Sequence, residues 1–296
     1  MKPSKIFHQY IWIINTLRAF KRLTLEELNQ KWQADSIADG NALSRSSFYR
    51  HRDAILNMFG IIIDCDPISY QYYISNEHVL SDDSVERWLF STLTVHGVLS
   101  DSASVKESVV LENVPAGEEY LETILTAIKI RHRLHIGYQK FGAEGYEKTV
   151  CPYALKLFRQ RWYLLARTAD DQMRVYALDR TTSLCLTDEL FEIPTDFSPQ
   201  DYFAEYYGVL TDNTPLAHVV IRAYDRTASY LRTLPLHHSQ REIATTDTYT
   251  DFSFDIRPTA DFLAELLSHG GGIEVLEPAE LRQKIRSLIT ENLKRY

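Results

Sequence analysis

Positively charged side chains and aromatic rings are interleaved over residues 129–180, and this combination is suited to binding phosphates and bases. The segment holds eleven Lys and Arg against five Asp and Glu, a balance of +6 in a chain whose net charge is −8. Clustered cations repel one another unless an anion offsets them, and rings beside guanidinium groups suit stacked bases. We therefore expect an anionic effector here, either a single-stranded nucleic acid or a nucleotide. The candidate ligand-binding residues are Tyr138, Lys156, Arg159, Arg161, Tyr163, Arg174 and Arg180.

A purely structural interpretation of the same segment stays open. Alternate residues of a strand share a face, so Trp162 and Leu164 point one way and Arg161 the other. Trp162 and Leu164 are expected in the core of the domain, and the arginines are then rim charges on an exposed sheet. Asp179 is an alternative partner for its neighbour Arg180.

A second group of residues able to bind an anion lies at the start of a helix predicted over residues 44–60. A helical wheel gives it an apolar face made of Phe48, Ile55, Leu56 and Phe59, with Arg52 near that face. A helix that enters the major groove needs small polar residues near its N-terminus and an Arg able to bond guanine. We therefore predict that this helix binds double-stranded DNA through Arg45, Ser46, Ser47, Tyr49 and Arg50.

Residue patterns typical of enzymes or metal sites are not found in the sequence. His237 and His238 are adjacent, so on a strand their rings face opposite ways and do not form a metal site. Cys65, Cys151 and Cys185 are odd in number and widely spaced, which favours neither a disulfide framework nor a zinc site. We therefore expect a protein that is not an enzyme and that uses no metal and no cofactor.

Length and composition predict an ordinary globular protein of several domains. The chain has 296 residues, of which 45% are hydrophobic and 24% charged, enough for two or three separate cores. The apolar run near the start, residues 10–14, is too short for a membrane span or a signal peptide. The sequence thus indicates a cytoplasmic protein with no membrane partner.

Helix signals come first along the chain and are followed by a predicted hairpin. Apolar residues recur at helical spacing over residues 4–20, and Thr24 with Glu27 forms a capping-box pattern that begins a second helix ending near Gln33. The third helix, capped by Ser44, ends at Gly60. Residues 61–64 and 70–74 then read as two strands. Three helices and a hairpin outline a winged helix-turn-helix domain over residues 1–76.

The remainder of the chain divides into an acidic connector and two segments that contain strands. Residues 77–117 are predicted to be a helical connector with an apolar helix over 85–99. After a helix over 118–131, strand-like runs at 134–138, 146–150, 153–157, 161–166 and 173–178, with a possible sixth at 183–186, suggest a small barrel. Residues 196–215 are predicted to be a linker. The order β-α-β-β-α-β-α then indicates a ferredoxin-like α+β domain over 216–296.

Four short motifs in a fixed order carry a resemblance to a known family. Tyr138 lies in L-H-I-G-Y, Pro152 opens P-Y-A-L, R-W-Y-L-L-A-R spans Arg161–Arg167, and R-V-Y-A-L-D-R spans Arg174–Arg180. This order resembles the pattern of the WYL family of bacterial regulators over about sixty residues. The resemblance implies that residues 118–195 form an Sm-like or SH3-like barrel that senses nucleic-acid fragments or nucleotides. It also implies that the C-terminal α+β domain is the extension that follows many WYL domains.

Together these observations predict an α+β multidomain protein that acts as a ligand-responsive DNA-binding transcriptional regulator. We expect a homodimer formed through the connector and the C-terminal segments. Two alternatives stay open at this point. One is an RNA-binding or nucleotide-binding adaptor without operator binding, because residues 1–76 hold nine Lys and Arg against seven Asp and Glu, only +2. The other is a nucleic-acid-processing enzyme, which a carboxylate cluster in a cleft would reveal.

Overall fold

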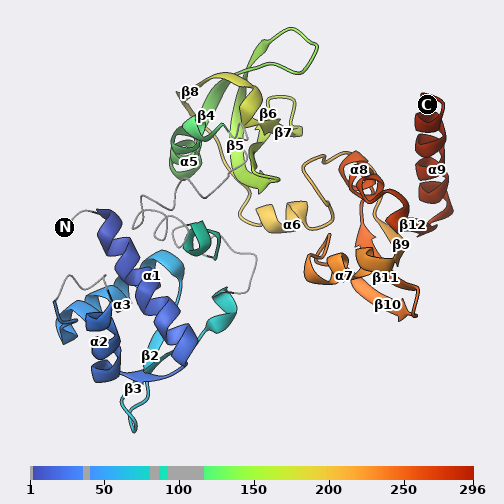
Figure 1. Cartoon of the computed structure of the whole chain (residues 1–296). Coiled ribbons are helices and arrows are strands. Elements are labelled where there is room, and N and C mark those ends of the chain that lie inside the picture. The colour runs from blue at the N-terminus through green and yellow to red at the C-terminus, as the bar shows by residue number, and fades with distance from the viewer. Residues whose placement is uncertain (1–2, 36–40, 81–86, 93–116) are drawn as a thin grey trace. The chain divides into compact units, whose positions relative to one another are not determined.

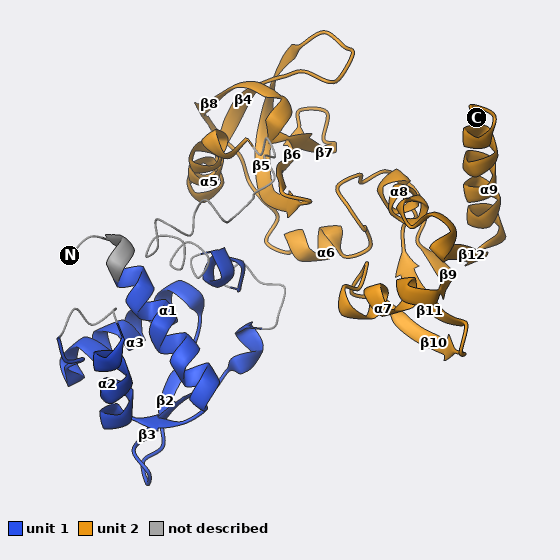
Figure 2. Ribbon diagram, in the orientation of Figure 1, with its two compact units in different colours: residues 1–112 blue, residues 113–296 orange. Residues whose placement is uncertain are grey.

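The structure, a computed structural model, describes residues 3–35, 41–80, 87–92 and 117–296 (Figure 1). The chain separates into two compact units, residues 1–112 and residues 113–296 (Figure 2). It is a mixed α/β protein, and the described part holds three antiparallel sheets, one in the first unit and two in the second. No helix in the described ranges is long and apolar enough to span a membrane.

The described residues 3–80 of the first unit form three α-helices and a small sheet, in the order that the sequence predicts. Strand β3 is the middle strand and pairs antiparallel with both β1 and β2. The two-residue strand β1, which precedes the second helix, is an addition to the prediction. The elements are α1 (Pro3–Phe20), β1 (Leu23–Thr24), α2 (Leu25–Ala34), α3 (Arg45–Phe59), β2 (Ile63–Cys65), β3 (Gln71–Ile74) and the 3-10 turn η2 (Glu77–Leu80).

Local hydrogen bonds set the ends of α2 and α3. The Thr24 side chain accepts from the N–H of Glu27, and the Glu27 carboxylate accepts from the N–H of Thr24, which completes the predicted capping box. Ser44 caps α3 by accepting from the N–H of Ser47. Gly60 ends α3 with a left-handed φ of 62°, a conformation that glycine adopts without steric cost.

The core of the first unit is formed by the inner faces of the helices and the sheet. Phe48, Ile55 and Phe59 of α3 are fully or almost fully buried in it, as the helical wheel predicts. Leu56 is an exception because 46% of its surface is exposed. The predicted apolar face of α3 is therefore narrower than expected. Of the apolar connector helix expected at residues 85–99, only 87–92 are described, and these are helical.

The second unit begins with a helix and a five-stranded antiparallel sheet. The strand order is β7-β6-β5-β4-β8, and β7 and β8 lie at opposite edges without pairing to each other. The sheet is therefore open among the described strands, whereas the sequence predicts a closed small barrel. Closure depends on pairing between the two end strands, which the spacing of strand-like runs does not encode. The elements are η4 (Glu118–Tyr120), α5 (Leu121–Ile130), β4 (His132–Tyr138), β5 (Tyr146–Phe158), β6 (Arg161–Thr168), β7 (Met173–Ala177), η5 (Leu178–Arg180) and β8 (Thr181–Leu190).

The runs predicted as two separate strands, 146–150 and 153–157, form one long strand, β5. The pairing register between β5 and β6 shifts between Pro152 and Ala154, where one extra residue is accommodated in β5. Pro152 is tolerated inside this strand because a bulge does not require the backbone donor that proline lacks. The bulge also changes which β5 side chains share a face, so that Val150 and Leu155 pack in one cluster and Tyr153 and Ala154 in another.

Apolar groups cover both faces of this five-stranded sheet. Helix α5 covers one face, where its Ile124 packs with Leu164 and Tyr176. The other face packs against the segment that follows β8, which includes Phe191. Consecutive β6 residues, Leu164 and Leu165, are consequently both buried although they point in opposite directions. Within the segment predicted as a linker, residues 199–203 form the short helix α6 (Pro199–Phe203).

The C-terminal part of the second unit has the element order that the sequence predicts. Its sheet has the strand order β10-β11-β9-β12 with antiparallel pairing throughout, which agrees with the expected ferredoxin-like arrangement. Phe252, Phe254 and Phe262 fill the core between this sheet and its helices. The elements are β9 (Ala217–Tyr224), α7 (Asp225–Thr233), β10 (Arg241–Thr245), β11 (Tyr249–Ile256), α8 (Ala260–Ser268), η6 (Gly270–Gly272), β12 (Ile273–Glu277) and α9 (Ala279–Leu293).

Candidate nucleic-acid interface and effector cavity

The polar face of α3 is exposed in the first unit. The side chains of Arg45, Ser46 and Arg50 are exposed, and Ser47 and Tyr49 are half-buried. Arg50 reaches back toward the helix start and donates to the Ser47 hydroxyl at 3.3 Å. The first turn of α3 therefore presents hydroxyl groups and guanidinium groups together. Such a helix start has unpaired N–H groups and a positive dipole end, both of which favour an anion.

Tyr49 connects α3 to the neighbouring hairpin. Its hydroxyl lies 3.1 Å from that of Tyr72 in β3 and accepts from Arg45 at 3.3 Å. The hydrogen bond with Tyr72, followed by that from Arg45, lowers the pKa of the Tyr49 hydroxyl. The guanidinium of Arg52 lies over the Tyr49 ring, 5.3 Å from its centre, so Arg52 is held at the edge of the helix instead of entering the core.

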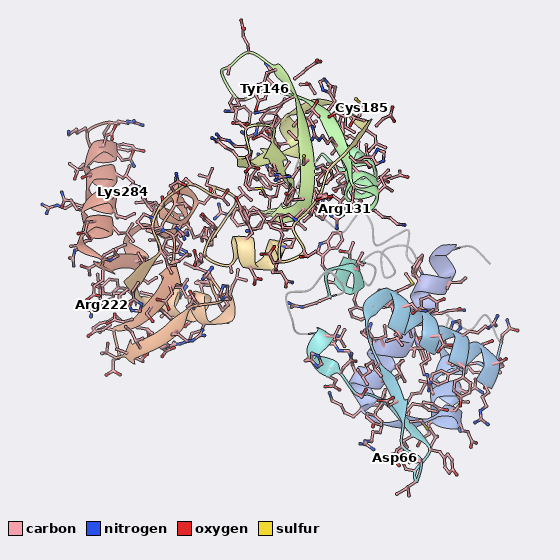
Figure 3. The ribbon with its side chains drawn as sticks, turned by 180° about the vertical axis from the view of Figure 1, so that it is seen from behind. Asp66, Arg131, Tyr146, Cys185, Arg222 and Lys284 are labelled. Carbon is pink, nitrogen blue, oxygen red and sulfur yellow. The ribbon has the colours of Figure 1, made fainter. Side chains whose placement is uncertain are left out.

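The turn between β2 and β3 is held by Asp66, which is labelled in Figure 3. Its carboxylate accepts from the backbone N–H groups of Ile68 and Ser69 and pairs with Arg22 at 3.1 Å. These bonds, the one from Ile68 first, lower the pKa of the Asp66 carboxyl. Ile68 is 90% exposed, and Tyr70 has a left-handed φ of 54° and is 71% exposed. The tip of this hairpin therefore exposes apolar side chains, and the hydrogen bonds to Asp66 fix its backbone.

A cavity of about 760 Å³ opens at the β7 edge of the five-stranded sheet in the second unit. Its described walls combine cations, aromatic rings and a backbone strap, residues 209–212, that follows α6 along the chain. Asp212 is the only carboxylate among the described residues that line it. The lining residues are Tyr138, Lys140, Phe141, Tyr146, Lys148, Met173, Arg174, Val175, Tyr176, Arg180, Val209, Leu210, Thr211 and Asp212.

Three of the seven predicted ligand-binding residues meet in this cavity: Tyr138, Arg174 and Arg180. The Tyr138 ring is buried against Tyr176, and its hydroxyl accepts from the N–H of Ala177 at 3.2 Å. Burial raises the pKa of both phenols, that of Tyr176 to about 12, so both stay neutral at physiological pH. Arg174 is exposed and donates to the side chain of Gln172.

The other four predicted residues lie outside the cavity. Lys156 and Tyr163 are cross-strand partners on the opposite face of the sheet, and the β5 bulge directs Lys156 to that face. Lys156 donates to the carbonyl of Gly208 at 2.6 Å, and its ammonium lies over the Phe203 ring. A single patch of all seven residues is therefore not formed.

The two remaining arginines are held by carboxylates. Arg159 sits in the turn between β5 and β6, where it and Gln160 have positive φ, and it pairs with Glu265 of α8. Arg161 pairs with Asp179 at 3.2 Å. The sequence offers Asp179 as an alternative partner for Arg180, but in the structure Asp179 pairs with Arg161.

Arg180 is the cation best prepared for an incoming anion. Its guanidinium carbon lies 4.9 Å from the centre of the Phe141 ring and 6.0 Å from that of Tyr138. Its Nε is buried without a hydrogen-bond partner in the part of the chain that the structure describes. Ring contacts leave guanidinium N–H groups available for a phosphate, because they engage the flat face of the group and not its edge.

Five further cationic or aromatic residues that line the cavity are not among the predicted ligands. Tyr146, labelled in Figure 3, begins β5 and pairs across the hairpin with Tyr138, which already carried a prediction. Phe141 lies in the turn between β4 and β5 and is 79% exposed. The sequence signal that could have predicted Phe141 as a ligand-binding residue is an aromatic residue in a turn within a cationic segment. The five residues are Lys140, Phe141, Tyr146, Lys148 and Tyr176.

Charge in the cavity is unevenly neutralised. Lys148 pairs with Asp170 at 3.2 Å, whereas no carboxylate pairs with Lys140 or Arg180 among the described residues. No group of three or more possible metal ligands occurs in the described ranges. The arrangement can therefore bind a phosphate through cations and hold a ring against Phe141, Tyr138 or Tyr146.

Comparison with protein families identifies two domains in the second unit. The WYL domain matches residues 119–186, which contain α5, the five-stranded sheet and most of the cavity. The WCX domain matches residues 215–293, the sheet and helices that follow. The chain is therefore a WYL domain-containing protein in which a WCX domain follows the WYL domain. No curated protein sequence matches the chain significantly.

Solved structures show similarity over most of the chain. Proteasome accessory factor B/C (PafBC) of Arthrobacter aurescens is 20% identical with a TM-score of 0.36, and the match covers 95% of this chain and 45% of that one. The chain thus spans less than half the length of PafBC. A crystal structure of a CRISPR Cas-related protein is 12% identical with a TM-score of 0.40, covering 92% of this chain and 70% of that one.

The buried ammonium of Lys156 leads to a prediction about stability and pH. Burial, opposed by the nearby Asp261 carboxylate, lowers the pKa of Lys156 to about 8. From pH 8 up to the ordinary pKa of lysine, the unfolded chain holds a proton that the folded chain has lost, so folding stability rises with pH. Relative to Lys156→Met, the wild-type free energy of unfolding should rise by up to about 3 kcal/mol across this window.

Urea denaturation of both proteins at a series of pH values measures this difference. Lys129→Met, which removes an exposed lysine near the end of α5, is the matched control and should leave the pH profile unchanged. Parallel profiles for wild type and Lys156→Met would show that the ammonium is not desolvated.

Proposed function

We propose that this protein is a DNA-binding transcriptional regulator whose WYL domain binds a phosphate-bearing effector, either a nucleic-acid fragment or a nucleotide. The observation that carries the proposal is the cavity in the WYL domain. Lys140 and Arg180 lack carboxylate partners there among the described residues, and Phe141 exposes a ring beside Arg180. Clustered cations without counter-charges are stabilised by an anion, and each stacked base adds about 1–3 kcal/mol.

The DNA-binding part of the proposal concerns the first unit. We propose that α1, α2 and α3 with the β2–β3 hairpin form a winged helix-turn-helix domain and that α3 is the recognition helix. The exposed positions of Arg45, Ser46 and Arg50 at the start of α3 support this assignment. The proposed domains are residues 1–76 for DNA binding, 77–117 as connector, 118–195 for effector sensing, 196–215 as linker and 216–296 as extension.

Regulation in this proposal follows from a change in the spacing of two DNA-binding domains. A dimer binds two half-sites about 34 Å apart or a multiple of that distance. The effector need only bind more tightly to one of two arrangements of the dimer in order to favour it. No covalent chemistry is required of the protein.

Arg50→Ala should weaken binding to a selected duplex by about 1–3 kcal/mol and relax base preference at one position, because a bidentate contact to guanine is lost. Fluorescence anisotropy with duplexes selected from a random pool measures both effects, across a salt series. Arg18→Ala removes an exposed arginine from α1 of the same unit and is the matched control. If Arg50→Ala and wild type select the same sequences with the same affinity, α3 does not read DNA. Failure of wild type to bind any duplex would favour the RNA-binding or nucleotide-binding adaptor.

Reversing the charge of Lys140 and Arg174 should weaken the binding of short oligothymidylate at least about tenfold, because both exposed cations line the cavity. Isothermal calorimetry at low salt on the full chain measures this, with a cyclic dinucleotide as the second ligand class. Lys129→Glu with Arg226→Glu gives the same change in net charge at exposed positions outside the cavity. Equal loss in both double variants would reduce the effect to net charge, and no binding of either ligand by wild type would refute the effector site.

We also propose that the protein is a homodimer formed through its C-terminal helix and the connector. Helix α9 leaves Leu288, Ile289 and Leu293 exposed beyond the buried Leu281, and an apolar helix face of this kind is stabilised by a second copy. The mass measured by light scattering at micromolar concentration should be that of a dimer, and Ile289→Glu with Leu293→Glu should reduce it. A wild-type monomer, with and without DNA, would contradict this proposal.

A further inference from the structure

One wall of the effector cavity is a backbone strap, residues 209–212, that lies outside the five-stranded sheet. The strap follows α6 and precedes β9, so it comes from the segment between the WYL and WCX domains. Backbone without sheet pairing must be held by other hydrogen bonds in order to form a defined wall. The bonds that hold this strap come from the WCX domain and from the segment between the two domains.

Asp261, in the first turn of α8, provides the central contact. One oxygen of its carboxylate, Oδ2, accepts from the backbone N–H of Val209 and from that of Leu210, each at 2.8 Å. Hydrogen bonds to an ionised acceptor are stronger than those between neutral groups. A single side chain of the WCX domain therefore positions the first two residues of the wall.

A side chain at the residue before the strap would displace Asp261. A Cβ built on Gly208 would lie 2.3 Å from the Asp261 carboxylate oxygen and 2.7 Å from its carboxyl carbon. The carbonyl of the same Gly208 accepts from Lys156 of the WYL sheet at 2.6 Å. Gly208 is thus contacted by Lys156 of the WYL domain and by Asp261 of the WCX domain, immediately before the chain reaches the cavity.

The far end of the strap is fixed by tyrosines that follow the sheet. The Tyr202 hydroxyl donates to that of Thr211 at 3.2 Å, and the Tyr206 hydroxyl donates to the carbonyl of Asp212 at 3.1 Å. These bonds are between neutral groups, and each typically contributes less than one to a carboxylate. Asp261 is consequently the strongest single determinant of where the strap lies.

We infer that Asp261, a residue of the WCX domain, is a positioning residue for the effector site. Its carboxylate holds the wall 209–212 in place against the ligand. The inference rests on the proposed effector function of the cavity. It implies that ligand affinity in the WYL domain depends on a WCX side chain that does not line the cavity. Effector binding and the position of α8 are then linked, because a ligand that contacts the strap also affects Asp261, the α8 residue that holds the strap.

Titration of the full chain with fluorescent oligothymidylate tests this inference. Asp261→Ala should weaken binding about tenfold, because two backbone N–H groups lose a charged acceptor and the wall is released. Asp261→Asn keeps a neutral acceptor at the same place and should restore part of the affinity. Glu280→Ala, which removes an exposed carboxylate from the first turn of α9, is the matched control and should bind as wild type does.

Hydrogen exchange of the peptide that contains the strap provides a readout independent of the ligand. The amides of Val209 and Leu210 should exchange faster in Asp261→Ala than in wild type, at a temperature where circular dichroism shows both to be folded. Wild-type binding combined with unchanged affinity in folded Asp261→Ala would overturn this inference alone. A wild-type chain that does not bind the probe would refute the proposed function, and this inference with it.

Discussion

The alternation of side chains along a strand whose two faces are both buried is the constraint on which the WYL sheet depends. One extra residue in β5, at the register shift between Pro152 and Ala154, exchanges the faces for everything that follows it in the strand. Val150 and Lys148 precede the shift and lie on the α5 face, with Lys148 at the cavity. Lys156 follows the shift and lies on the other face, where it contacts Gly208. The two lysines of β5 thus lie on opposite faces of the sheet, Lys148 at the cavity and Lys156 at the segment between the domains.

On one face these cations stabilise the junction between domains. Lys156 donates to the Gly208 carbonyl, which lies in the segment between the two domains, and Arg159 pairs with Glu265 of α8 in the WCX domain. An ammonium kept from water by burial would be costly without such an acceptor. On the other face, Arg174 and Arg180 stand at the edge of the sheet, and Arg180 is supported by aromatic rings. The second unit therefore separates structural cations from cations that are open to a ligand.

The first unit uses short-range bonds to present its exposed face. Ser44 accepts from Ser47 at the start of α3, and Tyr49 joins α3 to β3 through Tyr72. The recognition surface in our proposal is thus fixed at its N-terminal end and braced at its side. Arg50 is exposed above this support and donates to the Ser47 hydroxyl of the same helix. A rigid support of this kind lowers the entropy that the side chains lose on binding.

Much of this protein was determined by sequence signals that act over three or four residues. Thr24 with Glu27, and Ser44 with Gly60, mark helix ends because capping bonds join near neighbours, and the order of elements from β9 to α9 followed from local periodicity. The WYL motifs located the WYL domain for the same reason, since each motif is a short run of neighbouring residues.

Tertiary structure alone decided which of the predicted residues meet. The face that Lys156 occupies depends on a bulge in the pairing of β5 with β6, and the wall 209–212 reaches the cavity through contacts with Asp261, about fifty residues away along the chain. Phe141, in the turn between β4 and β5, lies beside Arg180, which follows β7. Strand pairing and loop position are set by the free energy of contacts between distant segments, and composition and spacing along one segment do not specify them.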